Sequence, residues 1–121
     1  MEEFVIVDGR LREYNGPGGD VVIPDGVKTI GPFAFSDYDG LDTEERAWNI
    51  TSVTLPDSVR RIENYAFAGR TESVCIRVPA SIVFFGEGVF EDCTALTLIV
   101  SPGSTAEGYA RWHSIPYRYN E

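Results

Sequence analysis

Short runs of alternating hydrophobic and polar residues, each ended by a proline, recur along the chain. In one of them Val53 and Leu55 alternate with polar neighbours until Pro56. A period of two predicts a short strand with one buried face, and proline ends it because proline lacks the N–H that a ladder needs. After a turn, Val59 and Phe67 are hydrophobic again. This pattern predicts a strand, a tight turn and a second segment that returns to the same interior.

The pattern occurs three times. It reads VVIPDGVKTIGPFAF at 21–35, VTLPDSVRRIENYAF at 53–67 and IRVPASIVFFGEGVF at 76–90, so the copies begin 32 and then 23 residues apart. A further step of 23 residues leads from Pro79 to Pro102. Four positions are hydrophobic or proline in every copy: Pro24, Pro56 and Pro79; Val27, Val59 and Ile82; Ile30, Ile62 and Phe85; and Phe35, Phe67 and Phe90. A period of about 20–29 residues with one short strand predicts a solenoid whose coils cover one another.

Both ends of the chain carry signals for caps that protect open strand edges. FVIVDGRLREYNG predicts two strands joined at Asp8 and Gly9, a strong hairpin signal. Near the other end, Ser104 followed three residues later by Glu107 is a capping box, which predicts a helix that reaches about His113. We expect this helix to lay Tyr109 and Trp112 over the last coil, because they are three residues apart on one face.

These elements predict a single domain that is mostly β with short helical turns. We expect a hairpin cap at 1–18, about three coils at 19–96 and a cap of helix and strand at 97–121. The first gap between copies is nine residues longer than the second, and the extra residues fall in an acidic insertion near 36–49. A solenoid accommodates such an insertion as a loop on one edge.

The repeats resemble the BspA-like leucine-rich repeats of bacteria, also called the Treponema pallidum type. IPDGVKTIGPFAF, LPDSVRRIENYAF and the terminal SPGSTAEGYARWHSIPY carry the resemblance, which covers residues 4–119. The chain departs from the motif at Glu63, where the other copies have Gly31 and Gly86, and at Val89, which replaces alanine. The resemblance implies a right-handed leucine-rich-repeat solenoid and a binding role, often in cell-surface or adhesive proteins. It implies no catalytic residues.

Composition narrows the classes of partner. The net charge is −9 and the sequence pI is about 4.5, which argues against nucleic acid and against an anionic membrane surface. We expect no membrane insertion, because no stretch approaches a membrane span. No secretory signal opens the chain, since Glu2 and Glu3 follow Met1, so we expect a soluble fragment or a complete intracellular protein. Localisation stays open between the cytoplasm and the cell surface that the resemblance implies.

Acidic residues crowd the insertion. Asp37, Asp39 and Asp42 are followed by Glu44 and Glu45. Carboxylates at alternate positions around a glycine can coordinate Ca²⁺, but the glycine comes too early for an EF-hand. The alternative is a solvated acidic loop, the usual character of a charge run. A weak candidate Ca²⁺ site and a solvated loop are the two interpretations.

The remaining candidates for chemistry are a histidine and two cysteines. His113 is the only histidine, and we expect it in the last turn of the helix, where a cation suits the dipole. Cys75 occupies an outward strand position that matches Ser52. The family resemblance implies that Cys93, in EDCTAL, is stacked inside the coil. We therefore expect two free thiols, one of them buried, and no cofactor.

Two columns of outward residues are candidate binding surfaces. The first is made by Lys28 and Thr29, Arg60 and Arg61, and Val83 and Phe84, and it runs from basic to apolar. An exposed aromatic beside arginines is typical of an interface centre, although Phe84 could instead fold under the cap against Trp112. The second column, on the other sheet, is Val22, Thr54 and Arg77.

The sequence thus favours a non-catalytic protein–protein interaction module with an unknown protein ligand. A structural or self-associating spacer is the first alternative, favoured by the small number of coils. A metal-dependent enzyme that uses the acidic insertion is the second, and it lacks a base, a nucleophile or a phosphate cradle beside the acids.

Overall fold

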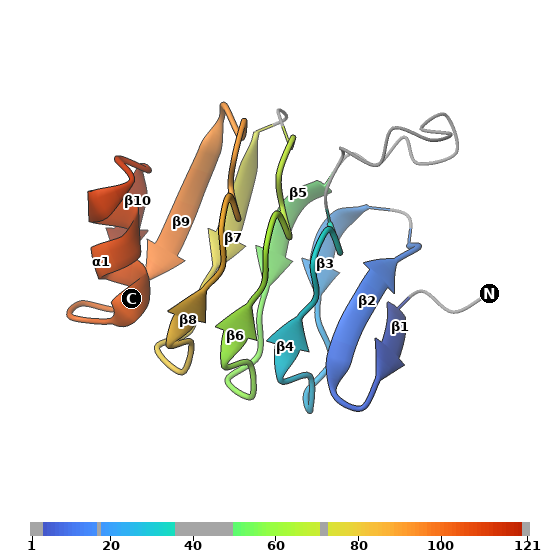
Figure 1. The fold of residues 1–121 in the computed structure, drawn as a ribbon. Coiled ribbons are helices and arrows are strands. Elements are labelled where there is room, and N and C mark those ends of the chain that lie inside the picture. The colour runs from blue at the N-terminus through green and yellow to red at the C-terminus, as the bar shows by residue number, and fades with distance from the viewer. Residues whose placement is uncertain (1–3, 17, 36–49, 71–72, 120–121) are drawn as a thin grey trace.

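The computed structural model describes residues 4–16, 18–35, 50–70 and 73–119. These residues form two five-stranded sheets and one helix, and the chain winds back and forth between the sheets (Figure 1). Sheet A contains β1 (Phe4–Val7), β2 (Arg10–Tyr14), β4 (Thr29–Ile30), β6 (Arg61–Ile62) and β8 (Phe84–Phe85). Sheet B contains β3 (Gly19–Val22), β5 (Ile50–Thr54), β7 (Val74–Arg77), β9 (Leu96–Val100) and β10 (Tyr117–Tyr119).

The solenoid has about four turns, whereas the sequence predicted about three. Three coils run from β3 to β4, from β5 to β6 and from β7 to β8, and their strands pair in parallel. The fourth begins with β9, which ends just before Pro102, the position one further repeat length along the chain. The fourth coil was missed because helix α1 (Thr105–Trp112) follows its strand, so the second half of the motif is absent there.

Side-chain hydroxyls join successive coils at equivalent positions. Ser58 Oγ donates to the Val27 carbonyl and Ser81 Oγ donates to the Val59 carbonyl, each at 2.7 Å. The acceptors belong to the preceding coil in both cases. The turn after the proline is therefore tied to its neighbour in the same way at each step, as nearest-neighbour stacking requires.

The aromatic residue of each copy points into a shared core, as predicted. The ring of Phe67 stacks on Phe35 at 5.1 Å and on Phe90 at 5.5 Å, measured between ring centroids. The row continues beyond the repeats at both ends, with Tyr14 tilted against Phe35 and Tyr109 edge-on to Phe90. We call the whole row the aromatic spine; it consists of Phe4, Tyr14, Phe35, Phe67, Phe90 and Tyr109.

The N-terminal hairpin is confirmed. β1 and β2 pair antiparallel around Asp8 and Gly9, whose φ angles of 54° and 79° give the left-handed turn that two-residue hairpins prefer. β2 then pairs in parallel with β4. The hairpin thus extends sheet A beyond the first coil, and β1 is its edge strand.

The segment after β4 and β6 forms hydrogen-bonded turns rather than the short helical turn expected. The Ala34 N–H donates to the Gly31 carbonyl, and the Ala66 N–H donates to the Glu63 carbonyl. Within these turns Phe33 and Tyr65 have φ angles of 61° and 59°. A left-handed residue cannot continue a right-handed helix, so these turns do not extend into a regular helix.

The C-terminal helix is confirmed in position but not in the face predicted for Trp112. Ser104 is the N-cap, and its side chain accepts from the Glu107 N–H. Ala106 and Ala110 are buried, whereas Trp112 is 85% exposed. Trp112 is two residues, or about 200°, around the helix from Ala110, so it points away from the last coil. Tyr109 does pack on the coil, as predicted, with its ring 4.2 Å from that of Phe85.

The carboxylate of Glu107 joins three parts of the cap. Its Oε1 accepts from the Gly103 N–H at 2.7 Å, and its Oε2 accepts from the Tyr119 hydroxyl at 2.5 Å. In a full capping box this carboxylate would accept from the N-cap N–H, but the Ser104 N–H donates to Ser101 instead. The hydrogen bond from Tyr119, followed by that from Gly103, lowers the pKa of Glu107 from its ordinary value of 4.5.

We expect Glu107→Gln to make thermal stability less dependent on pH in acid. Because the pKa of Glu107 is lower in the folded state, its carboxylate stabilises the fold above the unfolded value of 4.5. That contribution is lost as pH falls below this value. The melting temperature of the wild type should therefore exceed that of the variant at neutral pH, and this difference should shrink as pH falls below 4.5 and through the lowered pKa of Glu107. Glu87→Gln, which changes an exposed carboxylate, is the matched control; an equal narrowing there would contradict the assignment.

Candidate functional site

The outer face of sheet A carries one residue from each of four strands in a single row. Backbone register pairs Arg10 with Thr29, Thr29 with Arg61, and Arg61 with Phe84. The sequence predicted the last three as a column. Arg10 is an addition, because it belongs to the hairpin and not to a repeat.

A second row lies beside the first, nearer the turns. The Arg60 N–H donates to the Lys28 carbonyl and the Val83 N–H donates to the Arg60 carbonyl, so these three exposed residues are stacked in order. The predicted column is thus brought together by the coils. We call the two rows the sheet A face; it consists of Arg10, Lys28, Thr29, Arg60, Arg61, Val83 and Phe84.

Phe84 is 40% exposed, and the guanidinium carbon of Arg61 lies 4.2 Å from the centroid of its ring. The alternative that Phe84 folds under the C-terminal cap against Trp112 is wrong. The neighbouring Phe85 takes that place, packed against Tyr109 of α1. Because strand neighbours point to opposite sides, the burial of Phe85 turns Phe84 towards solvent.

Glu63 organises the cations of the sheet A face. Its Oε1 forms an ion pair with Arg10 Nη1, and its Oε2 lies 3.6 Å from Arg61 Nε. Arg61 in turn covers the ring of Phe84. The sequence did not predict this role, although it showed a signal: Glu63 stands where the other copies have glycine.

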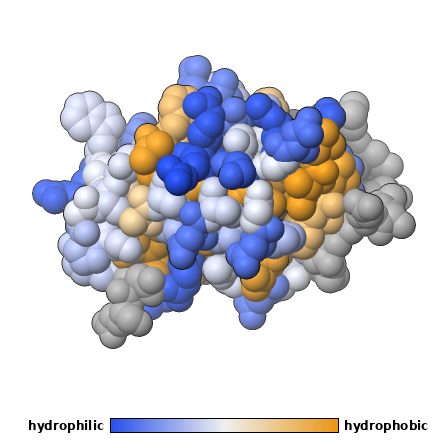
Figure 2. Space-filling view, turned by 90° about the horizontal axis from the view of Figure 1, so that it is seen from below, coloured by the Kyte–Doolittle hydropathy of each residue, from blue (hydrophilic) through white to orange (hydrophobic). Residues whose placement is uncertain are grey.

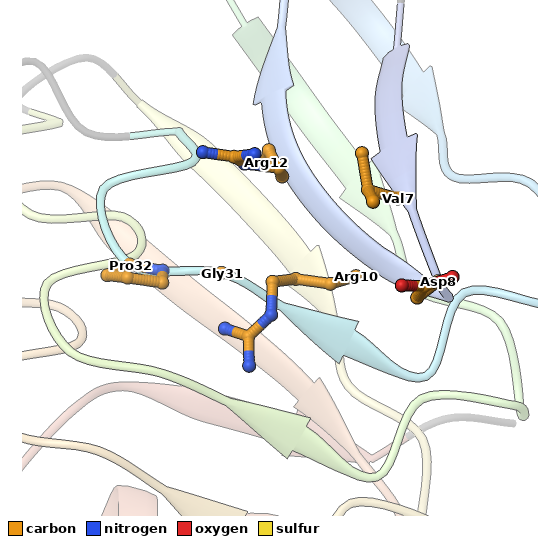
Figure 3. Close-up of a pocket in the computed structure, with 6 residues that line it drawn as sticks. All are labelled: Val7, Asp8, Arg10, Arg12, Gly31 and Pro32. Atoms are coloured by element: carbon orange, nitrogen blue, oxygen red, sulfur yellow. The ribbon is translucent and has the colours of Figure 1, made fainter.

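A cleft of about 670 Å³ adjoins the sheet A face at the N-terminal end of the molecule. It is lined by Val7, Asp8, Arg10, Arg12, Gly31 and Pro32 (Figure 3). The figure shows the guanidinium groups of Arg10 and Arg12 on opposite sides of the Gly31–Pro32 backbone. A Cβ at Gly31 would lie 2.8 Å from the Leu11 carbonyl oxygen, so glycine at this position lets the turn approach β2 closely. The repeat pattern does not predict this cleft, because the hairpin and the first coil form it together.

The second predicted column lies on the outer face of sheet B. Val22 is in register with Thr54, and Thr54 with Arg77. The row continues through Ile99 of β9 to Arg118 of β10. Val22 is 66% exposed, and the rest of the row is mixed in character. The two predicted columns are therefore on different sheets.

The candidate metal residues Asp37, Asp39 and Asp42 lie outside the described residues. Within the described ranges, no group of three or more His, Cys, Asp or Glu side chains is placed to hold a metal ion. No helix in the part of the chain that the structure describes is long and apolar enough to cross a membrane.

Both cysteines are free thiols, as predicted. Cys75 is opposite Ser52 in the register, also as predicted. Cys93 packs against the hydrophobic core, as expected of a residue inside the coil, but it is only partly buried, so the expectation of one buried thiol is wrong. Cys93 Sγ donates to the Phe67 carbonyl at 3.1 Å, which joins two coils. His113 is the C-cap of α1, and its ring lies against Tyr109 at 4.1 Å. Cys93 and His113 line one cleft of about 420 Å³, and each makes a contact within the fold.

Comparison with known proteins identifies the repeats. A family model described as a BspA type leucine rich repeat region of six copies matches residues 17–107. A search of curated proteins gave no match. A search of solved structures gave none either.

Proposed function

The chain belongs to the BspA-type leucine-rich repeat family, and from this membership and the sheet A face we propose that it is a non-catalytic module that binds another protein. Repeat solenoids of this kind are scaffolds that generally mediate protein interactions. The partner docks on the sheet A face, with Phe84 at the centre of the contact. A place on a cell surface is compatible with this role.

The observation that carries the proposal is the exposed ring of Phe84 with Arg61 laid over it. An aromatic side chain and an arginine are the residue types that contribute most binding energy at protein interfaces. The cation–π contact holds both side chains in place before a partner arrives, which lowers the entropy lost on binding. On the described part of sheet B, the predicted column contains neither an aromatic residue nor such a pair.

We expect Phe84→Asp to abolish the capture of a partner that the wild-type protein retains. The full chain would be immobilised and exposed to extracts of its source cells and of their host, and bound proteins would be identified by mass spectrometry. Val22→Asp is the matched control, because it places the same charge on an exposed apolar position of sheet B. With the purified partner, Phe84→Asp should raise the Kd by at least about tenfold, or 1.4 kcal/mol.

Both variants must first show the melting temperature of the wild type to within a few degrees. Loss of the partner with Val22→Asp alone would transfer the site to sheet B and the column of Val22, Thr54 and Arg77. Retention by both variants would refute binding through either predicted column.

Self-association is a second candidate, favoured by the edge strand β1. Its sequence FVIV leaves Ile6 and Val7 exposed, and Figure 2 shows a hydrophobic area at the N-terminal end of the molecule. An exposed apolar edge strand can pair with the same strand of a second copy. The net charge of −9 on each copy opposes this contact, so we rank it second. Sedimentation of the same preparations distinguishes the two, since pairing through β1 would give a dimer that Phe84→Asp leaves intact.

A further inference from the structure

We propose that the sheet A face and its adjoining cleft bind an extended acidic segment of a protein partner, with an apolar side chain at the end that reaches Phe84. This inference rests on the proposed function and adds the chemistry and the direction of the bound segment. Carboxylates would lie over β2 to β6, and the apolar side chain over β8.

The sheet A face and its cleft are rich in positively charged side chains. Five of the ten cations of the chain gather here: Arg10, Arg12, Lys28, Arg60 and Arg61. Of the ten acids in the described ranges, only Asp8 and Glu63 lie among the residues that make up the face and the cleft or pair with them. The protein as a whole has a net charge of −9, so this area has the opposite sign to the rest. Such an area attracts a short acidic segment, whereas a long polyanion such as nucleic acid would also meet the negative remainder.

The order of the strands gives the face a direction. Arginines lie on β2, lysine precedes β4, two arginines follow at β6, and the apolar Val83 and Phe84 lie at β8. Neighbouring strands are about 4.8 Å apart, so β8 is about 14 Å from β2. An extended chain covers this distance in about four residues. The partner should therefore carry its acids about four residues away from its apolar residue.

The cleft supplies the carboxylate end of the site. Arg12 is exposed on β2, and no ion pair of Arg12 is found among the described residues. Its guanidinium extends over the cleft, while Glu63 holds the guanidinium of Arg10 on the other side of Gly31 (Figure 3). A guanidinium binds a carboxylate through two parallel hydrogen bonds, which fixes both position and orientation. The cleft, of about 670 Å³, leaves room for the carboxylate to approach Arg12.

The test uses a fluorescent peptide of about ten residues, with two adjacent glutamates, a leucine about four residues further on, and glycine and serine elsewhere. A matched peptide carries lysines in place of the glutamates. Fluorescence polarisation with the full chain should detect binding of the acidic peptide only. Added salt should weaken this binding, because exposed charges are screened. Arg12→Glu should weaken it by at least about tenfold, whereas Arg77→Glu on sheet B should leave it unchanged.

Three results would overturn the inference: no binding of the acidic peptide, equal binding of the lysine peptide, or the same affinity for Arg12→Glu as for the wild type. Arg12→Gln keeps the length of the side chain and separates loss of the cation from charge reversal, and it should also weaken binding. If Phe84→Asp loses the captured partner while Arg12→Glu keeps it, the proposed protein-binding role is supported, and the proposal that the bound segment is acidic is refuted. If both variants keep the partner, binding through the sheet A face and recognition of an acidic segment are both refuted.

Discussion

Replacing Phe67 with alanine should destabilise the protein by about 3–5 kcal/mol, the usual cost of removing a large buried aromatic ring. Phe67 is 1% exposed, and its ring is stacked between those of Phe35 and Phe90 at 5.1 and 5.5 Å. The rings on both sides belong to other coils, so they cannot both move in to fill the cavity without breaking the register of the strands. A small domain is stable by about 5–15 kcal/mol, so this single change removes a large part of the total.

Urea denaturation followed by circular dichroism measures this effect. Phe84→Ala is the matched control, because it removes the same ring from an exposed position, and it should cost much less. A loss near zero for Phe67→Ala, or equal losses for the two variants, would show that the aromatic spine does not support the fold.

We expect the second large effect from Gly86→Ala. This change should lower the free energy of unfolding by about 1–3 kcal/mol, the usual loss when a packed interior is overfilled. A Cβ at this position would lie 2.7 Å from the Asn64 nitrogen and 2.9 Å from the Glu63 carbonyl carbon. Both are backbone atoms of the preceding coil, so the coils would have to separate. The hydrogen bond from the Gly86 N–H to the Ile62 carbonyl, 2.8 Å long, would stretch as a result.

Gly108→Ala is the control of opposite sign. Gly108 lies in α1, and a Cβ there would meet nothing within 4 Å. Alanine is favoured over glycine in a helix by about 1 kcal/mol, so this variant should be more stable than the wild type. The midpoints of urea denaturation for the two variants should therefore move in opposite directions. Destabilisation by Gly108→Ala and tolerance of Gly86→Ala would contradict the packing described.

The fold was largely predictable because the repeats are in register. Three copies that align without gaps place Phe35, Phe67 and Phe90 at one position of the coil, and stacking then brings the rings together. Tyr14 and Phe4 were not predicted as members of the spine, since neither belongs to a copy of the motif. Trp112 was placed wrongly because two small alanines, and not the largest side chain, determine which face of α1 is buried.

The candidate site was predictable only in part. Thr29, Arg61 and Phe84 share a repeat position, so their alignment followed from the sequence. The role of Glu63 depends on Arg10, which is 53 residues away in the chain and belongs to the hairpin. Contacts between a repeat and a cap have no period, and this is why the cleft beside Arg12 could be found only in three dimensions.

The hydroxyl links of Ser58 and Ser81 join each coil to the one before it by the same bond at the same place. If a unit of 23 residues were duplicated, the new coil could form the same serine hydrogen bond with the coil before it and with the coil after it. Every added unit would lengthen the sheet A face by about 4.8 Å, close to one and a half residues of an extended chain. The length of the solenoid can therefore grow in fixed steps of one coil, while the N-terminal hairpin and the C-terminal helix remain unchanged.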